Sequence, residues 1–205
     1  MGLSQDAMDT GRKPDFFTWL ALGLVLAVAA ALELLGDPGR ELLRYDRAAI
    51  ASGDIWRLLS GHLVHLGWSH LLLNAVGFLL IGYLVAAFFN LRQWAAIFGV
   101  VIIGTDLGFW FLEPQLSWYV GLSGLLHGLL TAGAIKAVYS GQREFWFILA
   151  FLVGKLCYEQ LLGPLPGSEN TSGGNVVVAA HLYGAGSGAL AGLFFSFRKA
   201  PQATI

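Results

Sequence analysis

The chain has few charged residues and little sulfur. Of its 205 residues, 12% are Asp, Glu, Lys or Arg, against about 25% in soluble domains. The formal net charge is −1, so there is no basic surplus of the kind that binds nucleic acid. The single cysteine, Cys157, excludes an internal disulfide and is expected to be a buried apolar residue. With 56% hydrophobic residues, the composition predicts one membrane domain.

In place of charged residues, the chain contains long apolar segments. Six of them approach the roughly 20 residues that a helix needs to cross a bilayer, and breaks rich in Gly, Pro or polar residues separate them. The first lacks a small-residue cleavage site, so we interpret it as a retained span. We expect an all-α membrane protein, with a six-helix domain over 16–197 between tails at 1–15 and 198–205. The expected spans are 16–35, 67–89, 93–111, 121–139, 145–162 and 176–196.

The distribution of Lys and Arg predicts the orientation. The short loops 112–120 and 163–175 contain neither, whereas the breaks on the opposite side all do. Both termini should therefore be cytoplasmic. The long first loop, 36–66, mixes both signs of charge with apolar residues and should be a partly helical segment at the outer interface. The expected cytoplasmic cations are Arg12, Lys13, Arg92, Lys136, Arg143, Arg198 and Lys199. The expected outer aromatic belt comprises Trp56, Trp68, Trp118 and Tyr119.

Polar side chains gather in the outer halves of the second, fourth and sixth spans. Such groups are costly in a bilayer and usually functional. Ser123 lies 13 residues before Lys136, about 20 Å along a helix. It should therefore lie about 10 Å below the outer boundary of a roughly 30 Å core, where water reaches it from outside. The polar residues are His70, Asn74, Ser123, His127, His181 and Tyr183.

Ser123 and His181 are the candidate nucleophile and base. A serine becomes a nucleophile when a neighbouring base takes its proton, and histidine supplies such a base. Glycines spaced four apart predict close packing of the fourth and sixth spans, which a short serine side chain needs to reach a histidine. His127, one turn after Ser123, is the alternative base, and a serine here can also serve packing alone. The glycines are Gly124, Gly128, Gly184, Gly188 and Gly192.

Other polar residues suggest supporting roles. His70 and Asn74 share a helix face and, with the Ser123 N–H, offer donors for an oxyanion; alternatively they only bridge helices. Asp106, in the outer part of the third span, is expected to be structural, with a supporting role for the histidine as the alternative. A Ser-His dyad without an acid is the simpler interpretation.

The fifth span carries Lys155 and Glu159 at a spacing of four. We expect an ion pair, either lining the side where substrate enters or purely structural. No cofactor or metal is expected. A small transporter is a weaker alternative, because no inverted repeat is visible.

At these residues the chain resembles the rhomboid family of intramembrane serine proteases. The resemblance extends over essentially the whole chain and implies a rhomboid-like bundle of six transmembrane helices. It also implies a nucleophile at Ser123, a base at His181 and oxyanion support from His70 and Asn74. The matching motifs are Trp56-Arg57, His70-Leu-Leu-Leu-Asn74, Gly121-Leu-Ser-Gly124 and Ala180-His-Leu-Tyr-Gly184.

More narrowly, residues 121–128 together with Lys155 and Glu159 resemble the rhombosortase branch. That branch occurs in Gram-negative bacteria and is associated with removing carboxy-terminal Gly-Gly sorting tails from exported proteins. The resemblance implies an inner-membrane enzyme whose site opens to the periplasm and whose substrates are single-span proteins with small residues near the outer boundary. The alternative is a catalytically inactive rhomboid-like scaffold that binds membrane helices, against which the intact Ser123 and His181 argue.

Overall fold

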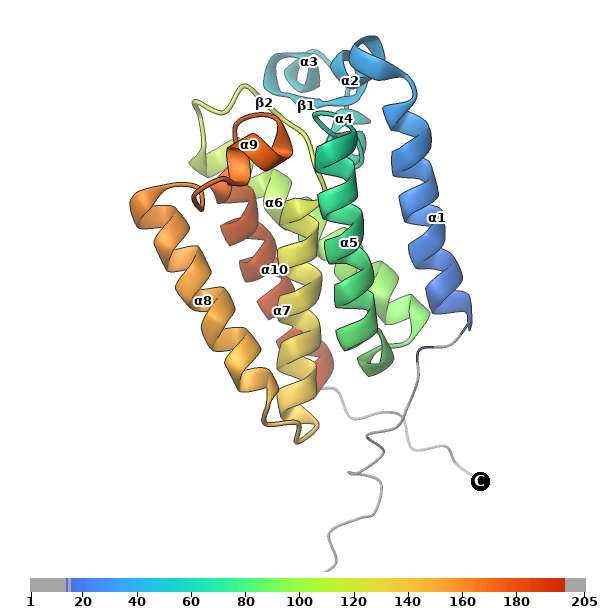
Figure 1. Ribbon diagram of the computed structural model, residues 1–205, viewed down its shortest axis with the longest axis vertical. Helices are drawn as coiled ribbons and strands as arrows, with labels where there is room; N and C mark the ends of the chain where they lie inside the picture. Colours follow the sequence, from blue (N-terminus) through green and yellow to red (C-terminus); the bar gives the residue numbers. More distant parts are fainter. Residues whose placement is uncertain (1–13, 15, 198–205) are drawn as a thin grey trace, which may run out of the picture.

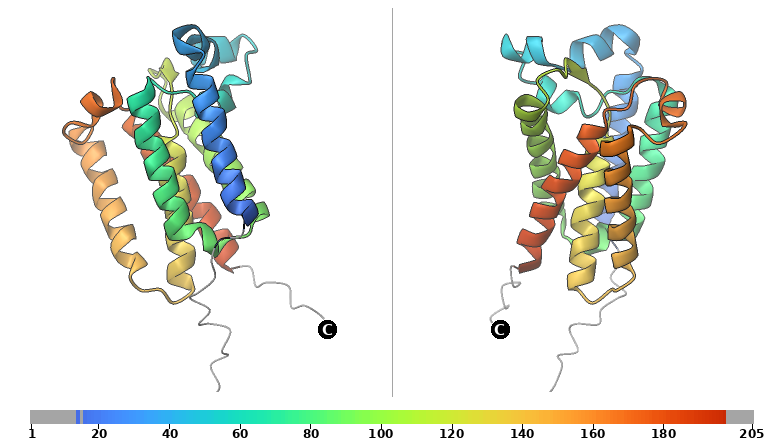
Figure 2. Two further views of the ribbon diagram at one scale, coloured as in Figure 1. Left: turned by 45° about the vertical axis from the view of Figure 1, so that its right-hand side comes forward. Right: turned by 90° about the vertical axis from the view of Figure 1, so that its left-hand side faces the viewer.

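The long apolar segments form a bundle of helices. A computed structural model describes residue 14 and residues 16–197. The six expected spans all fold as helices, which confirms the prediction of an all-α membrane bundle (Figures 1 and 2). The long helices are α1 (Phe16–Glu33), α5 (Trp68–Val85), α6 (Leu91–Leu112), α7 (Ser123–Tyr139), α8 (Phe145–Leu162) and α10 (Val178–Phe197).

Helix α7 differs from the other long helices. Within the described residues, the other five are long and apolar enough to cross a membrane. Helix α7 has 17 residues, about 25 Å of helix, and it begins lower in the bundle than α5 (Figures 1 and 2). It packs against α5, α6, α8 and α10, and most of its residues are buried. Because protein surrounds it, α7 does not need a lipid-facing apolar surface along its whole length.

Helices α7 and α10 approach backbone to backbone. A Cβ on Gly184 would lie 2.0 Å from the carbonyl oxygen of Gly124, and one on Gly188 would lie 2.1 Å from that of Gly128. No side chain fits at such distances, so glycine is required at both positions of α10. The predicted glycine-mediated packing is therefore confirmed. It brings the first residue of α7 beside the first turn of α10.

Short elements cover one end of the bundle (Figure 1). The first loop is partly helical, as predicted, and its strand pairs antiparallel with a strand before α7, Tyr45 lying opposite Tyr119. The start of α1 and the end of α10 lie at the opposite end of the bundle (Figure 1). The short elements are α2 (Gly36–Leu43), β1 (Tyr45–Asp46), α3 (Arg47–Ala51), α4 (Arg57–Ser60), β2 (Trp118–Tyr119) and α9 (Ser168–Ser172), while η2 (Ala86–Phe88) follows α5.

Two arginines fasten the first loop. Arg47 donates hydrogen bonds to the carbonyl oxygen of Trp110, in the last turn of α6, and to those of Glu113 and Leu116 beyond its end. The Trp110 carbonyl is one of the last four of the helix, which have no partner within it. Arg57 is buried, pairs with Asp54 and donates to the carbonyl oxygens of Glu41 and Arg44. Arg57, the arginine of the Trp-Arg motif, therefore stabilises the conformation of the first loop through contacts within the loop.

The prediction that Tyr119 belongs to an outer aromatic belt is wrong. Its side chain is buried, and its ring packs against Phe109 and His62. Its hydroxyl donates to the carbonyl oxygen of Gly121 at 2.5 Å. Burial raises the pKa of Tyr119 to about 12, which keeps the phenol a donor. Tyr119 thus holds the segment that leads into Ser123. The other three residues, Trp56, Trp68 and Trp118, are exposed.

Candidate active site

Ser123 and His181 meet at the start of two helices. Ser123 is the first residue of α7, and His181 lies in the first turn of α10. The Nε2 atom of His181 is 3.0 Å from the Oγ atom of Ser123, within hydrogen-bond reach of a general base. His181 is buried, whereas Ser123 is half-buried. Ser123 is therefore the more accessible of the two residues.

A carboxylate contacts the other nitrogen of the same histidine. The Nδ1 atom of His181 is 2.9 Å from Oε2 of Glu159. The second carboxylate oxygen of Glu159, Oε1, accepts a hydrogen bond from Lys155 Nζ at 2.7 Å, which confirms the predicted ion pair. The sequence predicted a Ser-His dyad, with Asp106 at most in a supporting role, and did not predict the contact between Glu159 and His181. The structure places the Glu159 carboxylate against the histidine.

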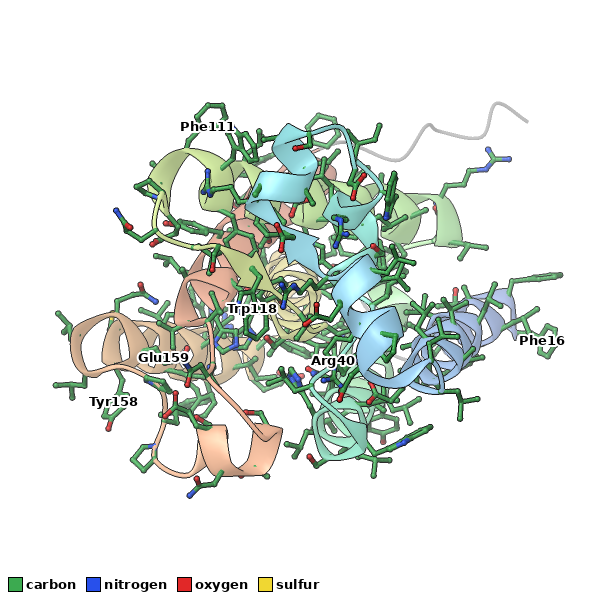
Figure 3. All side chains as sticks on the ribbon, turned by 90° about the horizontal axis from the view of Figure 1, so that it is seen from above. Phe16, Arg40, Phe111, Trp118, Tyr158 and Glu159 are labelled. Atoms are coloured by element: carbon green, nitrogen blue, oxygen red, sulfur yellow. The ribbon has the colours of Figure 1, made fainter. Side chains whose placement is uncertain are left out.

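The pattern of burial on α8 explains why Glu159 points inward. Leu152, Leu156 and Glu159 recur at three- and four-residue spacing and are buried, as expected for one helix face. Leu152 and Leu156 pack against Ala185 of α10. Glu159 lies nearer the centre of the bundle than its neighbour Tyr158 (Figure 3).

The side of α8 that faces away from the bundle is exposed. Cys157 lies there, so the expectation that this thiol is buried is wrong. A small apolar residue is equally suited to a surface that contacts lipid and to a protein core. The sequence therefore does not distinguish these two environments for Cys157.

Asp106 has a different partner. Its Oδ1 atom is 3.1 Å from Nε2 of His62, and both residues are buried. The pair joins α6 to the segment between α4 and α5. This contact agrees with the structural role expected for Asp106.

His127 lies beside the base rather than in its place. Its Nδ1 atom is 2.7 Å from the carbonyl oxygen of Ser123, so the Nδ1–H must donate there. Its ring stacks on that of His181, with centroids 4.2 Å apart and planes 18° from parallel. This geometry favours His181 as the base and gives His127 the role of supporting one face of the imidazole.

His70 and Asn74 border the backbone just before Ser123. A Cβ on Gly121 would lie 2.8 Å from Cε1 of His70 and 3.8 Å from Nδ2 of Asn74. Gly121 has φ +120°, a conformation that other residues rarely adopt. The Nδ1 atom of His70 accepts from the N–H of Leu66 at 3.4 Å, which leaves the ring proton on Nε2. The Asn74 amide donates one N–H to the carbonyl oxygen of His70 at 3.2 Å and keeps the other. Each side chain therefore has a donor available near the turn that leads into Ser123.

One group of side chains in the described part of the chain has the spacing of metal ligands. Ligand atoms of His127, Glu159 and His181 lie within 4.8 Å of one another. Both oxygens of Glu159 are already hydrogen-bonded, one of them to the ammonium group of Lys155. That positive charge would repel a divalent cation. The arrangement fits a hydrogen-bonded acid–base chain better than a metal centre.

Comparison with known proteins agrees with this geometry. Residues 52–198 match the family model described as Rhomboid domain. The match takes in α4 to α10 and with them every residue of the candidate site. An uncharacterized protein of Mycobacterium leprae (strain TN) is similar to this chain, at 26% identity over 201 residues, covering 91% of this chain and 78% of that protein. Its name states no activity, so the family match carries the comparison.

Proposed function

This chain belongs to the rhomboid domain family, and we propose that it is an intramembrane serine endopeptidase with Ser123 as nucleophile and His181 as base. It is a multi-pass membrane protein, and members of this family are generally serine proteases that act on membrane-protein substrates within the bilayer. The observation that carries the proposal is the 3.0 Å contact between Ser123 Oγ and His181 Nε2 inside the helix bundle. The protease domain corresponds to residues 16–197.

The proposed reaction has two steps. In the first, Ser123 Oγ attacks the carbonyl carbon of the scissile peptide while its proton passes to Nε2 of His181. The imidazolium then gives that proton to the leaving amine, and the acyl group stays on Ser123 as an ester. In the second step His181 takes a proton from water, the hydroxide adds to the ester carbonyl, and Ser123 leaves with its proton restored.

The oxyanion of each tetrahedral intermediate needs fixed donors. The side chains of His70 and Asn74 border the turn at Gly121. Together with the Ser123 N–H, which lies at a helix start and has no partner within the helix, they would provide the oxyanion hole.

The position of α7 gives a route for water. Helix α7 begins, at Ser123, on the side of the bundle covered by the short elements, while the start of α6 and the turn between α7 and α8 lie toward the other end. Arg92 belongs to the start of α6, Lys136 to the last turn of α7, and Arg143 to the turn after it. The positive-inside rule makes that other end cytoplasmic. The site then opens to the periplasmic face of the inner membrane. The tail cations Arg12, Lys13, Arg198 and Lys199 lie outside the described residues.

The chemistry also restricts the substrate. An intact helix hydrogen-bonds its carbonyl oxygens and hides its carbonyl carbons, so the scissile segment must unwind before Ser123 can attack. Glycine destabilises a helix interior by about 1 kcal/mol relative to alanine and allows close backbone approach. We therefore propose single-span substrates with small residues, Gly-Gly in particular, near the outer boundary. The rhombosortase-like pattern at 121–128, Lys155 and Glu159 supports the same substrates.

A reporter tests this function. An exported protein carrying a carboxy-terminal tail of Gly-Gly, an apolar span and a basic end is co-expressed with the enzyme. We expect trimming that disappears with Ser123→Ala and with a tail in which Leu-Leu replaces Gly-Gly. Equal trimming of both tails would refute the unwinding argument. Trimming that persists with Ser123→Ala would remove the serine as nucleophile. Trimming of neither tail by the wild-type enzyme would leave a rhomboid protease with a different substrate.

A further inference from the structure

We propose that Glu159 is a positioning residue for His181, and that Lys155 orients the Glu159 carboxylate. Ser123, His181 and Glu159 would then act as a triad rather than as the dyad expected from the sequence. This inference rests on the proposed function, because it names a further residue of the same site.

A continuous chain of hydrogen bonds connects the four side chains. Ser123 Oγ lies 3.0 Å from His181 Nε2, His181 Nδ1 lies 2.9 Å from Glu159 Oε2, and Glu159 Oε1 lies 2.7 Å from Lys155 Nζ. All three distances are those of ordinary hydrogen bonds. Three different helices, α7, α10 and α8, supply the groups, so tertiary packing holds the chain together.

The chain fixes the tautomer of His181. An ionised carboxylate only accepts hydrogen bonds, so Nδ1 must carry a proton and donate it to Glu159. The lone pair of Nε2 then faces Ser123 Oγ. This is the tautomer that can take a proton from serine, and it is the tautomer that the aspartate of a serine-protease triad selects.

The position of Lys155 explains why His181 needs the Glu159 carboxylate as a partner. Its Nζ atom lies 3.4 Å from Nδ1 of His181, and an ammonium group can only donate. If Nδ1 accepted from Lys155, the ring proton would sit on Nε2 and His181 could not act as the base. Glu159 prevents this, because its two oxygens bind Lys155 and His181 separately.

The carboxylate also offsets charge during the reaction. When His181 becomes an imidazolium, a second positive charge forms beside the Lys155 ammonium. Glu159 lies against both cations and is 3% exposed. Electrostatic interactions are strong in such a water-poor site. Removing the charge of Glu159 would leave the two like charges facing each other.

The alternative is that Lys155 and Glu159 only fasten α8 to the bundle. Leu152 and Leu156 already pack against Ala185 of α10, so α8 has an apolar attachment that does not depend on the ion pair. A substitution at Glu159 that keeps its shape should therefore leave the protein folded, and changes in rate can be separated from changes in structure.

The first test is Glu159→Gln in the full-length enzyme, with folding checked by gel filtration and thermal unfolding. The Lys155 ammonium attracts the amide oxygen of Gln, which turns the NH₂ group toward Nδ1 and selects the wrong tautomer. We expect kcat to fall by about 10⁴-fold, as when the triad aspartate of trypsin is replaced by Asn, with KM little changed.

The double variant Lys155→Met/Glu159→Gln is the decisive control. Without the ammonium, the amide can turn its oxygen to Nδ1 and restore the productive tautomer. We expect the double variant to be at least tenfold more active than Glu159→Gln alone. A folded Glu159→Gln enzyme with wild-type kcat, or a folded double variant no faster than the single one, would overturn the proposal.

A second measurement does not depend on activity. In the Ser123→Ala protein, the strongly hydrogen-bonded Nδ1–H of His181 should give a far-downfield proton resonance. It should be lost in Ser123→Ala/Glu159→Gln and in Ser123→Ala/His181→Gln, which assigns it. Its absence from folded Ser123→Ala would overturn the proposal. If the resonance is present but the wild-type enzyme cleaves nothing, the proposed function fails while the positioning contact stands.

Discussion

Gly184 of α10 lies directly against the backbone of Gly124 in α7: a Cβ on Gly184 would come within 2.0 Å of the Gly124 carbonyl oxygen. Gly124 follows Ser123, and Gly184 lies three residues after His181. The distance between these two backbones therefore sets how closely the nucleophile and the base approach.

Gly184→Ala should separate α7 from α10 and abolish most activity. Forcing a methyl group into a filled contact typically destabilises a protein by about 1–3 kcal/mol. We expect a lower thermal midpoint in detergent and a loss of at least 10²-fold in turnover. Gly186→Ala is the matched control, because a Cβ at Gly186 would meet nothing within 4 Å. Equal effects of the two substitutions would show that the close approach is unimportant.

Asn74→Ala should reduce turnover more than substrate binding. An oxyanion donor acts mainly in the transition state, and removing one typically lowers kcat by about 10²–10³-fold. Steady-state cleavage of a reporter in detergent separates kcat from KM. Asn90→Ala is a suitable control, because Asn90 caps α6 through the N–H of Gln93 and should affect stability alone. A raised KM with normal kcat for Asn74→Ala would contradict the oxyanion role.

The two stacked histidines should differ sharply. His181→Ala should abolish cleavage, because Nε2 of His181 is the group in contact with Ser123 Oγ. His127→Ala should retain measurable activity, because its Nδ1–H is engaged by a backbone carbonyl oxygen. The same reporter assay compares the two proteins at equal folded concentration. The reverse ranking would make His127 the base.

We predict that the free energy of unfolding decreases at acid pH because of His65. It is fully buried, and its ring lies edge-on to that of His70, with centroids 5.1 Å apart. Burial, reinforced by the neighbouring His70, lowers the pKa of His65 to about 3. In the unfolded chain His65 takes up a proton near pH 6.5, whereas in the folded protein it stays neutral until about pH 3. The free energy of unfolding therefore decreases as the pH falls from about 6.5 toward 3, by up to about 1.4 kcal/mol per pH unit.

Thermal or denaturant unfolding between pH 7 and pH 5 measures this dependence. His65→Phe, which keeps an apolar ring, should flatten the decrease relative to wild type. An unchanged slope would show that His65 is not the group responsible.

The spans and the Ser123–His181 pair could be predicted from the sequence for a physical reason. Apolar length reports a membrane helix directly, and glycines four apart identify the helix faces that touch. With the faces of α7 and α10 fixed, the positions of Ser123 and His181 at the two helix starts follow.

The contact between Glu159 and His181 could not be predicted in the same way. Helix α8 is apolar over most of its surface, so its sequence does not define which side faces the bundle. Lys155 and Glu159 were recognisable as a pair because their spacing is local. The partner across the interface depends on the rotation of α8 about its axis, which packing of Leu152 and Leu156 determines. Tyr119 was misplaced because a tyrosine suits a membrane interface and a hydrogen-bonded core equally.

Covalent labelling of the wild-type protein in membranes with a fluorophosphonate tests the central claim most directly, because only an activated serine reacts. The account predicts one labelled site, mapped by mass spectrometry of peptides to Ser123, with labelling lost in His181→Ala and retained in Gly186→Ala. A folded protein that remains unlabelled, or that is labelled at another serine, would contradict it.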